Sequence, residues 1–256
     1  MRLPIKPIFL LADSRPLFAD DDPERSLLRA VRRQVDEGWV KAAYIGAANG
    51  DEPAFYEIFE AAMARIAVRT CRHVRAGYGE TDQAFLREAD IVLLAGGDVA
   101  EGWRVIESTG MQQHLIEAYY RGAVLLGVSA GAVHLGLRGQ AGEKPGPNDH
   151  FPCLQLVPYA VDAHDEMRDW LRLRALIDRQ PRLRGLGLPT GASARFDHGG
   201  LLEPLDAPLV EFMHRSRWDD AQDGAAADPD AQAPPAEDES GLAVVQSLLL
   251  PSPVQA

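Results

Sequence analysis

The sequence has few cysteines, no long apolar run and fewer basic than acidic residues. Its two cysteines, Cys71 and Cys153, lie far apart and belong to no CxxC or Cys/His cluster, so we expect neither a metal site nor a disulfide framework. No window approaches the roughly 20 apolar residues that a membrane-spanning helix requires. The net charge of -12 disfavours nucleic acid as a partner. We therefore expect a protein of a reducing compartment, without nucleic-acid or membrane partners.

The acidic residues are unevenly distributed. Eight of them fall between Asp219 and Glu239, where Lys and Arg are absent, so the rest of the chain is only mildly acidic. The segment 219–240 combines these acids with Ala and Pro and has no apolar periodicity. That composition predicts a disordered loop that adds solubility.

The first residues contain a short apolar run. Pro4 and Pro7 interrupt it and Asp13 closes it before any small-residue cleavage pattern, which predicts a strand rather than a signal peptide. Together with the low cysteine content, this favours a cytoplasmic location.

The first half alternates short apolar runs with longer amphipathic stretches, which is typical of a parallel sheet covered by helices. We predict buried strands over residues 7–12, 40–45, 91–94 and 123–128. Leu and Val at helical spacing predict helices over residues 23–36, 53–66 and 110–121. The fold class is therefore α/β, with a doubly wound, mostly parallel sheet flanked by helices.

The second half is less regular, and we predict a strand over residues 154–157 and a helix over 165–178. A length of 256 residues favours one α/β hydrolytic domain, spanning residues 1–218. After the acidic loop 219–240, residues 241–256 should supply a last strand and a C-terminal tail.

The segment with the clearest chemistry is Gly127-Val-Ser-Ala-Gly-Ala132, where an apolar strand runs into small residues and a helix start. A serine on such a turn exposes its hydroxyl at the carboxyl edge of the sheet, where open α/β sheets bind ligands. The following helix directs N–H groups towards the same point. We therefore predict that Ser129 is a nucleophile.

A second strand ends in Gly96-Gly97-Asp98 at what should be the neighbouring edge. The backbone amides of this turn are candidates for an oxyanion hole. An alternative is an ordinary strand-to-helix turn in which Asp98 caps the helix.

An activated serine needs a base, and seven histidines are available. His164 is the best placed, because it follows a predicted strand in a polar loop, whereas His114 and His134 lie within predicted helices. Asp162 and Asp165 flank it, and either is a candidate to orient the ring or to cap the next helix.

These segments resemble the serine peptidases that include aspartyl dipeptidase (peptidase E) and cyanophycinase, which are related in fold to class I glutamine amidotransferases. The strand ending in Gly96-Gly97-Asp98 is similar to the family's GGN turn, and Gly127 to Ala132 is similar to its GxSAGA elbow. Asp162-Ala-His164 followed by Arg168 resembles a D-x-H-x-x-x-R segment of cyanophycinase. The similarity spans roughly residues 5 to 200.

The resemblance implies a role for each matching position. Ser129 becomes the nucleophile, His164 the base and Asp162 the candidate acid. Gly97 and the amide of Ala130 form the oxyanion hole. Asp98, Arg168 and Thr190 become candidate substrate ligands, and no cofactor or metal is required.

The chain departs from the family at two of these positions. Thr190 stands where a carboxylate proposed to support the site is usual, and Asp98 stands where asparagine is usual. The departure at Thr190 leaves the third member of the triad unassigned. The carboxylate of Asp98 near a developing oxyanion would be unhelpful unless it contacts a cationic substrate group, so a different substrate is plausible.

The sequence thus favours a serine-dependent amide hydrolase that cleaves small acidic peptides or isopeptides, such as Asp-X or β-aspartyl peptides. A non-catalytic, amidotransferase-like binding module is the alternative, because the two departures also suit a decayed site. A glutamine amidotransferase would need cysteine at the elbow, and an ordinary α/β-hydrolase would need an HGGG-type loop that the sequence lacks. A homodimer is compatible with the sequence.

Overall fold

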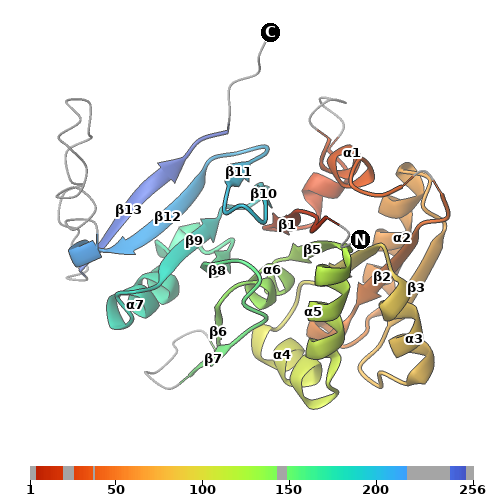
Figure 1. The fold of residues 1–256 in the computed structure, drawn as a ribbon. Coiled ribbons are helices and arrows are strands. Elements are labelled where there is room, and N and C mark those ends of the chain that lie inside the picture. The colour runs from red at the N-terminus through yellow and green to blue at the C-terminus, as the bar shows by residue number, and fades with distance from the viewer. Residues whose placement is uncertain (1–3, 20–25, 37, 143–148, 218–242, 252–256) are drawn as a thin grey trace, which may run out of the picture.

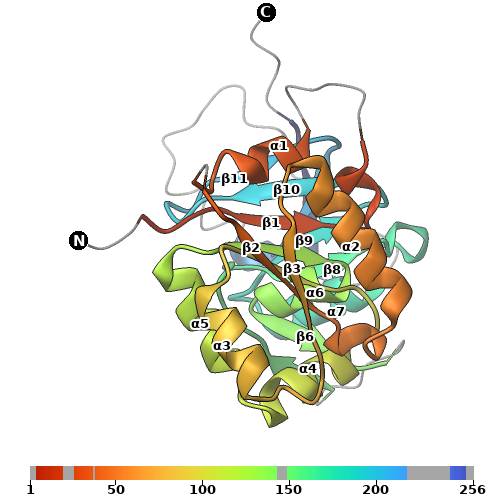
Figure 2. The same cartoon turned by 90° about the vertical axis from the view of Figure 1, so that its right-hand side faces the viewer.

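The computed structural model describes residues 4–19, 26–36, 38–142, 149–217 and 243–251. The predicted acidic loop 219–240 lies outside these ranges. In the described residues, a seven-stranded sheet, a four-stranded sheet, a small two-stranded sheet and the surrounding helices make up the fold (Figures 1 and 2).

The larger sheet has seven strands in the order β11-β10-β1-β5-β4-β2-β3. Its first five strands in chain order pair in parallel, and the last two add an antiparallel edge. The bounds are β1 Ile8–Leu11, β2 Lys41–Ile45, β3 Thr70–Val74, β4 Ile91–Leu94, β5 Val124–Val128, β10 Ser193–Phe196 and β11 Leu202–Pro204. All four strands predicted in the first half are therefore confirmed.

Helices cover both faces of this sheet, so it is doubly wound as predicted. On β1, Phe9 and Leu11 pack on one face while Ile8 and Leu10 pack on the other. The first face is covered by α1 Leu27–Arg32 and α2 Pro53–Arg65. The second is covered by α3 Glu80–Glu88, α4 Val99–Ser108, α5 Met111–Arg121 and α6 Ala130–Leu135. None of the described helices is long and apolar enough to cross a membrane.

A second sheet, not foreseen from the sequence, has the strand order β13-β12-β9-β8. Helix α7 (Leu171–Arg179) packs on it through a small apolar cluster that includes Trp170, Leu173 and Phe212. Its strands are β8 Ala160–Ala163, β9 Arg184–Leu188, β12 Leu209–His214 and β13 Val244–Leu249. Strand β8 is the element that leads into His164.

Shorter elements connect these layers. A hairpin of β6 Arg138–Gln140 and β7 His150–Pro152 follows α6. The 3-10 turns are η1 Arg15–Leu17, η2 Ala47–Asn49 and η3 Glu166–Arg168.

The strand predicted over residues 154–157 is wrong. These residues form an irregular segment whose amides cap the end of α6: Leu154 donates to the carbonyl of His134 at 2.9 Å, and Val157 donates to that of Leu135 at 3.0 Å. The apolar residues are buried, as a strand's would be, but their backbone pairs with a helix end.

The helix predicted over residues 165–178 is interrupted. It consists of η3 and α7, separated by Asp169 and Trp170, which both have positive φ values of 50° and 55°. Left-handed residues cannot continue a right-handed helix, so the chain changes direction here.

Candidate active site

Ser129 sits on the turn between β5 and α6, in a strained backbone conformation with φ 48° and ψ -110°. Its amide donates to the carbonyl of Leu11 at 2.9 Å, which fixes the turn against β1. A non-glycine residue with positive φ is costly and persists where the surrounding structure holds it, as at functional sites. This backbone conformation exposes the serine hydroxyl at the carboxyl end of the strand, as in other nucleophile turns.

The flanking glycines are required by close packing. A Cβ at Gly127 would lie 2.6 Å from the amide nitrogen of Ala132, and one at Gly131 would lie 2.1 Å from the carbonyl oxygen of Leu94. Neither distance is compatible with any side chain. The small residues of the elbow thus allow α6 to start directly against the ends of β4 and β5.

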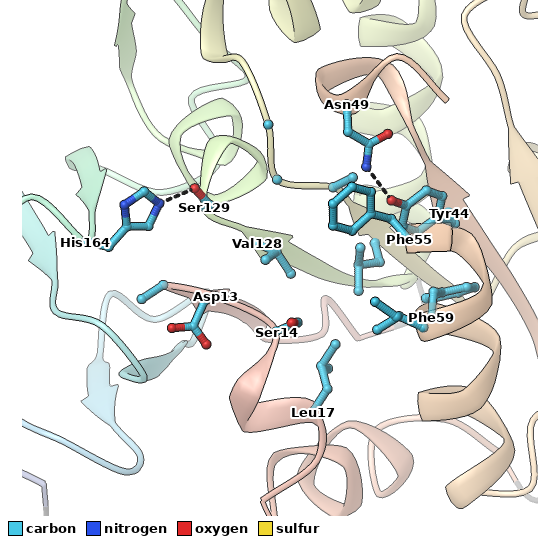
Figure 3. Close-up of a pocket in the computed structure, with 16 residues that line it drawn as sticks. Asp13, Ser14, Leu17, Tyr44, Asn49, Phe55, Phe59, Val128, Ser129 and His164 are labelled. Atoms are coloured by element: carbon cyan, nitrogen blue, oxygen red, sulfur yellow. Dashed lines mark hydrogen bonds between the residues drawn. The ribbon is translucent and has the colours of Figure 1, made fainter. Parts of the chain in front are cut away.

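His164 reaches the serine from the second sheet. It follows β8, has a φ of 46°, and donates its amide to the carbonyl of Leu188 at 2.9 Å. Its Nε2 atom lies 2.7 Å from Oγ of Ser129, within hydrogen-bond distance (Figure 3). This is the distance that general-base activation of a serine requires.

The Gly96-Gly97 turn passes close to the serine. A Cβ at Gly96 would lie 3.3 Å from Cβ of Ser129. Gly97 has a φ of 141°, and a Cβ there would lie 2.0 Å from the carbonyl oxygen of Ala48, so only glycine fits. The two turns therefore meet at the carboxyl edge, as the sequence predicts.

A cavity of about 320 Å³ opens beside these groups. Ser129, His164 and Gly97 line it, together with residues from the ends of β1, β2, β4 and β5, from η1 and η2, and from α2 (Figure 3). Among the predicted site residues, these three are the ones that line the cavity.

Comparison with known proteins decides the family. The model of peptidase family S51 matches residues 9–201, which is most of the chain. The chain belongs to peptidase family S51. It is therefore a member of a family of serine peptidases, and the resemblance stated from the sequence is confirmed.

Two solved structures share the S51 fold. A peptidase from an acI-B1 actinobacterium has 15% sequence identity and a TM-score of 0.62, with 80% of this chain and 90% of that chain covered. A protein described as peptidase E from Listeria monocytogenes EGD-e has 15% identity and a TM-score of 0.55, with coverage of 78% and 99%. No protein with a curated description matches the chain.

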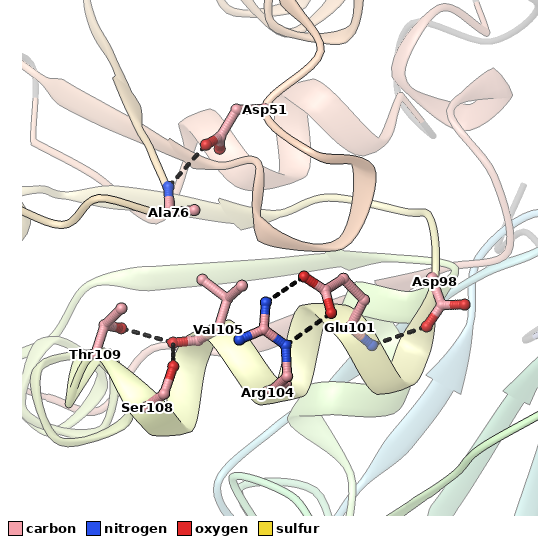
Figure 4. Close-up of polar contacts among 8 residues, drawn as sticks. All are labelled: Asp51, Ala76, Asp98, Glu101, Arg104, Val105, Ser108 and Thr109. Atoms are coloured by element: carbon pink, nitrogen blue, oxygen red, sulfur yellow. Dashed lines mark hydrogen bonds and ion pairs between the residues drawn. The ribbon is translucent and has the colours of Figure 1, made fainter.

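Asp98, at a position where the family usually has asparagine, acts as a helix cap. Its Oδ1 atom accepts a hydrogen bond of 2.8 Å from the amide of Glu101 in α4 (Figure 4). Its own amide donates to the carbonyl of Ala48 at 2.7 Å. Asp98 does not line the cavity, so its observed contacts are structural.

Asp162 does not contact His164 through any hydrogen bond found among the described residues. Its Oδ1 atom instead accepts hydrogen bonds from Arg172 at 3.1 Å and from the amide of Ala163 at 3.0 Å. It also lines a separate small cavity between α7 and the β6 strand. The orienting role predicted for Asp162 thus has no hydrogen bond to support it among the described residues, because β8 directs this carboxylate towards α7, and the charge of His164 is the smallest of the influences on its pKa.

The environment of Asp162 is unfavourable to its charge. Burial raises the pKa of this carboxyl to about 6, although the Arg172 guanidinium opposes the rise. The nearby Asp165 carboxylate, 3.6 Å from the same guanidinium, contributes to the increase.

Glu166 is a candidate that sequence reasoning missed. Its Oε1 atom accepts a hydrogen bond of 3.1 Å from the amide of Thr190, the position that lacks the family's usual carboxylate. Its Oε2 atom is buried and has no hydrogen-bond partner among the described residues. Burial acts to raise the pKa of Glu166, but hydrogen bonds at Thr190 and the proximity of His164 outweigh it and lower the pKa.

The signal that could have identified Glu166 was its position two residues after His164. The sequence pattern predicts a helix at residue 166, whereas this residue begins the short turn η3, which brings its carboxylate to the Thr190 loop. Arg168, the predicted carboxylate ligand, lies in the same turn, is exposed and does not line the cavity.

Proposed function

We propose that this protein hydrolyses amide bonds of small peptides through an acyl-enzyme formed on Ser129. The observation that carries the proposal is the 2.7 Å contact between Oγ of Ser129 and Nε2 of His164 on a strained strand-to-helix turn. Membership of a serine peptidase family supports it.

The reaction follows from these groups. His164 accepts the hydroxyl proton as Oγ of Ser129 bonds to the substrate carbonyl carbon, and the carbonyl oxygen becomes an oxyanion. The C–N bond then breaks, and His164 passes its proton to the leaving amine. A water molecule, deprotonated by the same imidazole, hydrolyses the resulting ester and frees the serine.

The amides of Gly97 and Ala130 are proposed donors to the oxyanion. Ala130 is the first residue of α6, where backbone N–H groups lack helical partners and the helix dipole favours negative charge. Gly97 belongs to the turn that packs against Ser129. Both positions match the family pattern for this role.

We propose Glu166, rather than Asp162, as the carboxylate that orients His164. Glu166 has a buried oxygen without a partner among the described residues, and it lies at the Thr190 loop. Asp162 is held by Arg172 instead. A carboxylate near the base keeps the imidazole in the required tautomer and stabilises its protonated form.

The acidic substrates predicted from the sequence depend on Arg168. This arginine is exposed on η3 and lies outside the cavity lining. We propose that it contacts a substrate carboxylate outside the cavity, such as the C-terminal carboxylate of a dipeptide. Arg168→Ala should weaken binding of such peptides and leave their amidated forms unaffected.

Labelling by a fluorophosphonate probe tests the proposed function. We expect the wild type to be labelled and Ser129→Ala to be inert, because the probe reacts only with an activated hydroxyl. Ser108→Ala, which alters an exposed serine on α4, is the matched control and should be labelled normally. Absence of labelling in the wild type would favour the non-catalytic binding module.

A further inference from the structure

We propose that the cavity beside Ser129 binds an apolar side chain, aromatic or branched aliphatic, on the substrate residue whose carbonyl is attacked. The inference rests on the proposed function and names the substrate class for it. It departs from the acidic residue at this position that the sequence predicts.

The wall of the cavity is predominantly apolar. Leu17 of η1, Val128 of β5 and the rings of Phe55 and Phe59 of α2 face it (Figure 3). At about 320 Å³ it lies at the lower end of the range for ligand pockets, roughly 300–1,000 Å³. That volume suits a single side chain with its adjoining backbone.

Two apolar residues at the rim are exposed to solvent. Phe55 is 51% exposed and Ile58 is 38% exposed, and both line the cavity. They lie on one face of α2, since residues three apart are neighbours on a helix. Adjacent exposed apolar side chains at a cavity mouth are typical of a surface that a ligand covers.

The polar groups of the cavity argue against a carboxylate there. Among the described residues that line the cavity, two have acidic or basic side chains, Asp13 and His164. None of these lining residues is Lys or Arg. An acidic side chain would lose its hydration and face the carboxylate of Asp13, whose own cation, Arg15 at 3.8 Å, lies outside the described lining.

The far end of the cavity carries neutral polar groups. Nδ2 of Asn49 donates to Oη of Tyr44 at 2.7 Å, while Oδ1 of Asn49 is buried without a hydrogen-bond partner among the described residues, and this lone acceptor would repel a carboxylate. Burial raises the pKa of Tyr44, and the phenol is therefore neutral near pH 7.

The position of His164 assigns the cavity to the acyl side of the scissile bond. The leaving amine must receive its proton from His164, so it lies on that side of Ser129. Figure 3 shows the aromatic rings of α2 on the opposite side of Ser129 from His164. The side chain in the cavity therefore belongs to the residue that acylates the serine.

A panel of dipeptides tests this inference. X-Ala peptides with X as Phe, Leu or Asp share one leaving group, so their kcat/KM values compare the cavity contacts alone. We expect Phe and Leu to exceed Asp by more than about 100-fold. Diphenyl esters of α-aminoalkylphosphonates that carry the same three side chains, in which the serine displaces phenol from phosphorus, provide a second readout through their rates of labelling.

Two variants test whether the cavity residue Phe55 is responsible for the preference for apolar side chains. Phe55→Ala should lower kcat/KM for the Phe and Leu peptides by roughly 10- to 200-fold, the range for lost apolar pocket contacts, and leave the Asp peptide unchanged. Tyr120→Ala is the matched control, because this aromatic residue is 53% exposed on α5, outside the cavity lining.

The outcomes separate the two proposals. If the fluorophosphonate fails to label Ser129, the proposed function is refuted. If Ser129 is labelled but the Asp peptide or the Asp probe reacts as fast as its Phe counterpart, the function stands and the apolar specificity is refuted. If Ser129 is labelled but no peptide is cleaved, the labelling rates test the apolar specificity. Faster labelling by the Phe and Leu probes supports it, and equal or faster labelling by the Asp probe refutes it.

Discussion

Replacing Asp162 with asparagine separates a structural carboxylate from a catalytic one. The substitution keeps the shape of the side chain and its ability to accept hydrogen bonds from Arg172 and Ala163, and it removes only the charge. Because this carboxylate faces Arg172 rather than His164, we expect peptidase activity to change by less than about threefold. Loss of a triad acid lowers kcat by about 10⁴.

The effect on stability depends on pH. The pKa of Asp162 rises from its ordinary value of 3.8 to about 6 in the folded protein, so the folded state binds the proton more tightly than the unfolded state. Stability contributed by this group is therefore greatest below pH 4 and declines as the pH rises to 6. A shift of about two units corresponds to about 3 kcal/mol of unfolding free energy.

The assay compares thermal unfolding of the wild type and Asp162→Asn from pH 4 to pH 7. Asparagine resembles the protonated acid, so the two proteins should have similar melting temperatures at pH 4. At pH 7 the variant should gain up to about 6–12 °C relative to the wild type, given the usual relation between free energy and Tm for a chain of this size. Glu57→Gln, on the exposed face of α2, controls for the loss of one negative charge.

Two results would contradict this reasoning. A fall in kcat of a thousandfold or more, with normal stability, would restore Asp162 as the orienting acid. A Tm difference that stays constant from pH 4 to pH 7 would show that burial does not penalise its charge.

Substitutions at three further positions test other parts of the site. Glu166→Gln should lower kcat by roughly 10³- to 10⁴-fold and move the acid limb of the kcat/KM profile to lower pH, because the carboxylate that stabilises protonated His164 is lost, while Glu166→Asp retains partial activity; steady-state kinetics against pH measures both. Gly131→Ala should cost about 1–3 kcal/mol in urea unfolding, because its Cβ would lie 2.1 Å from the carbonyl oxygen of Leu94. Asp98→Ala should cost about 1 kcal/mol through loss of the α4 cap, whereas Asp98→Asn, the family's usual residue, should cost little in the same assay.

The first half of the fold could be predicted because its signal is local. Strands β1, β2, β4 and β5 are buried on both faces, so nearly every residue in them is apolar and the runs are visible in the sequence. Strand β3 was missed because it lies at the edge of the sheet and its Thr, Arg and His side chains are only half-buried.

The errors in the second half have a common cause. Residues 154–157 have the composition of a strand, yet their backbone partners are carbonyls at the end of α6. Nothing in a run of apolar residues specifies which backbone groups its amides will meet. The second sheet was missed for the same reason, since the sequence does not specify that β8, β9, β12 and β13 pair with one another and not with the larger sheet.

The pairing of Ser129 with His164 was predictable, whereas the third group was not. The serine lies on a turn whose small residues are dictated by contacts below 3 Å, and such constraints leave a motif in the sequence. The carboxylate near the base has no such constraint, because a long side chain can reach the same place from several backbone positions. Glu166 reaches the Thr190 loop from η3, so a family acid missing from that loop does not by itself indicate a decayed site. The kinetics of Glu166→Gln and Asp162→Asn, measured side by side, would show whether the acid has moved to a different element of the fold.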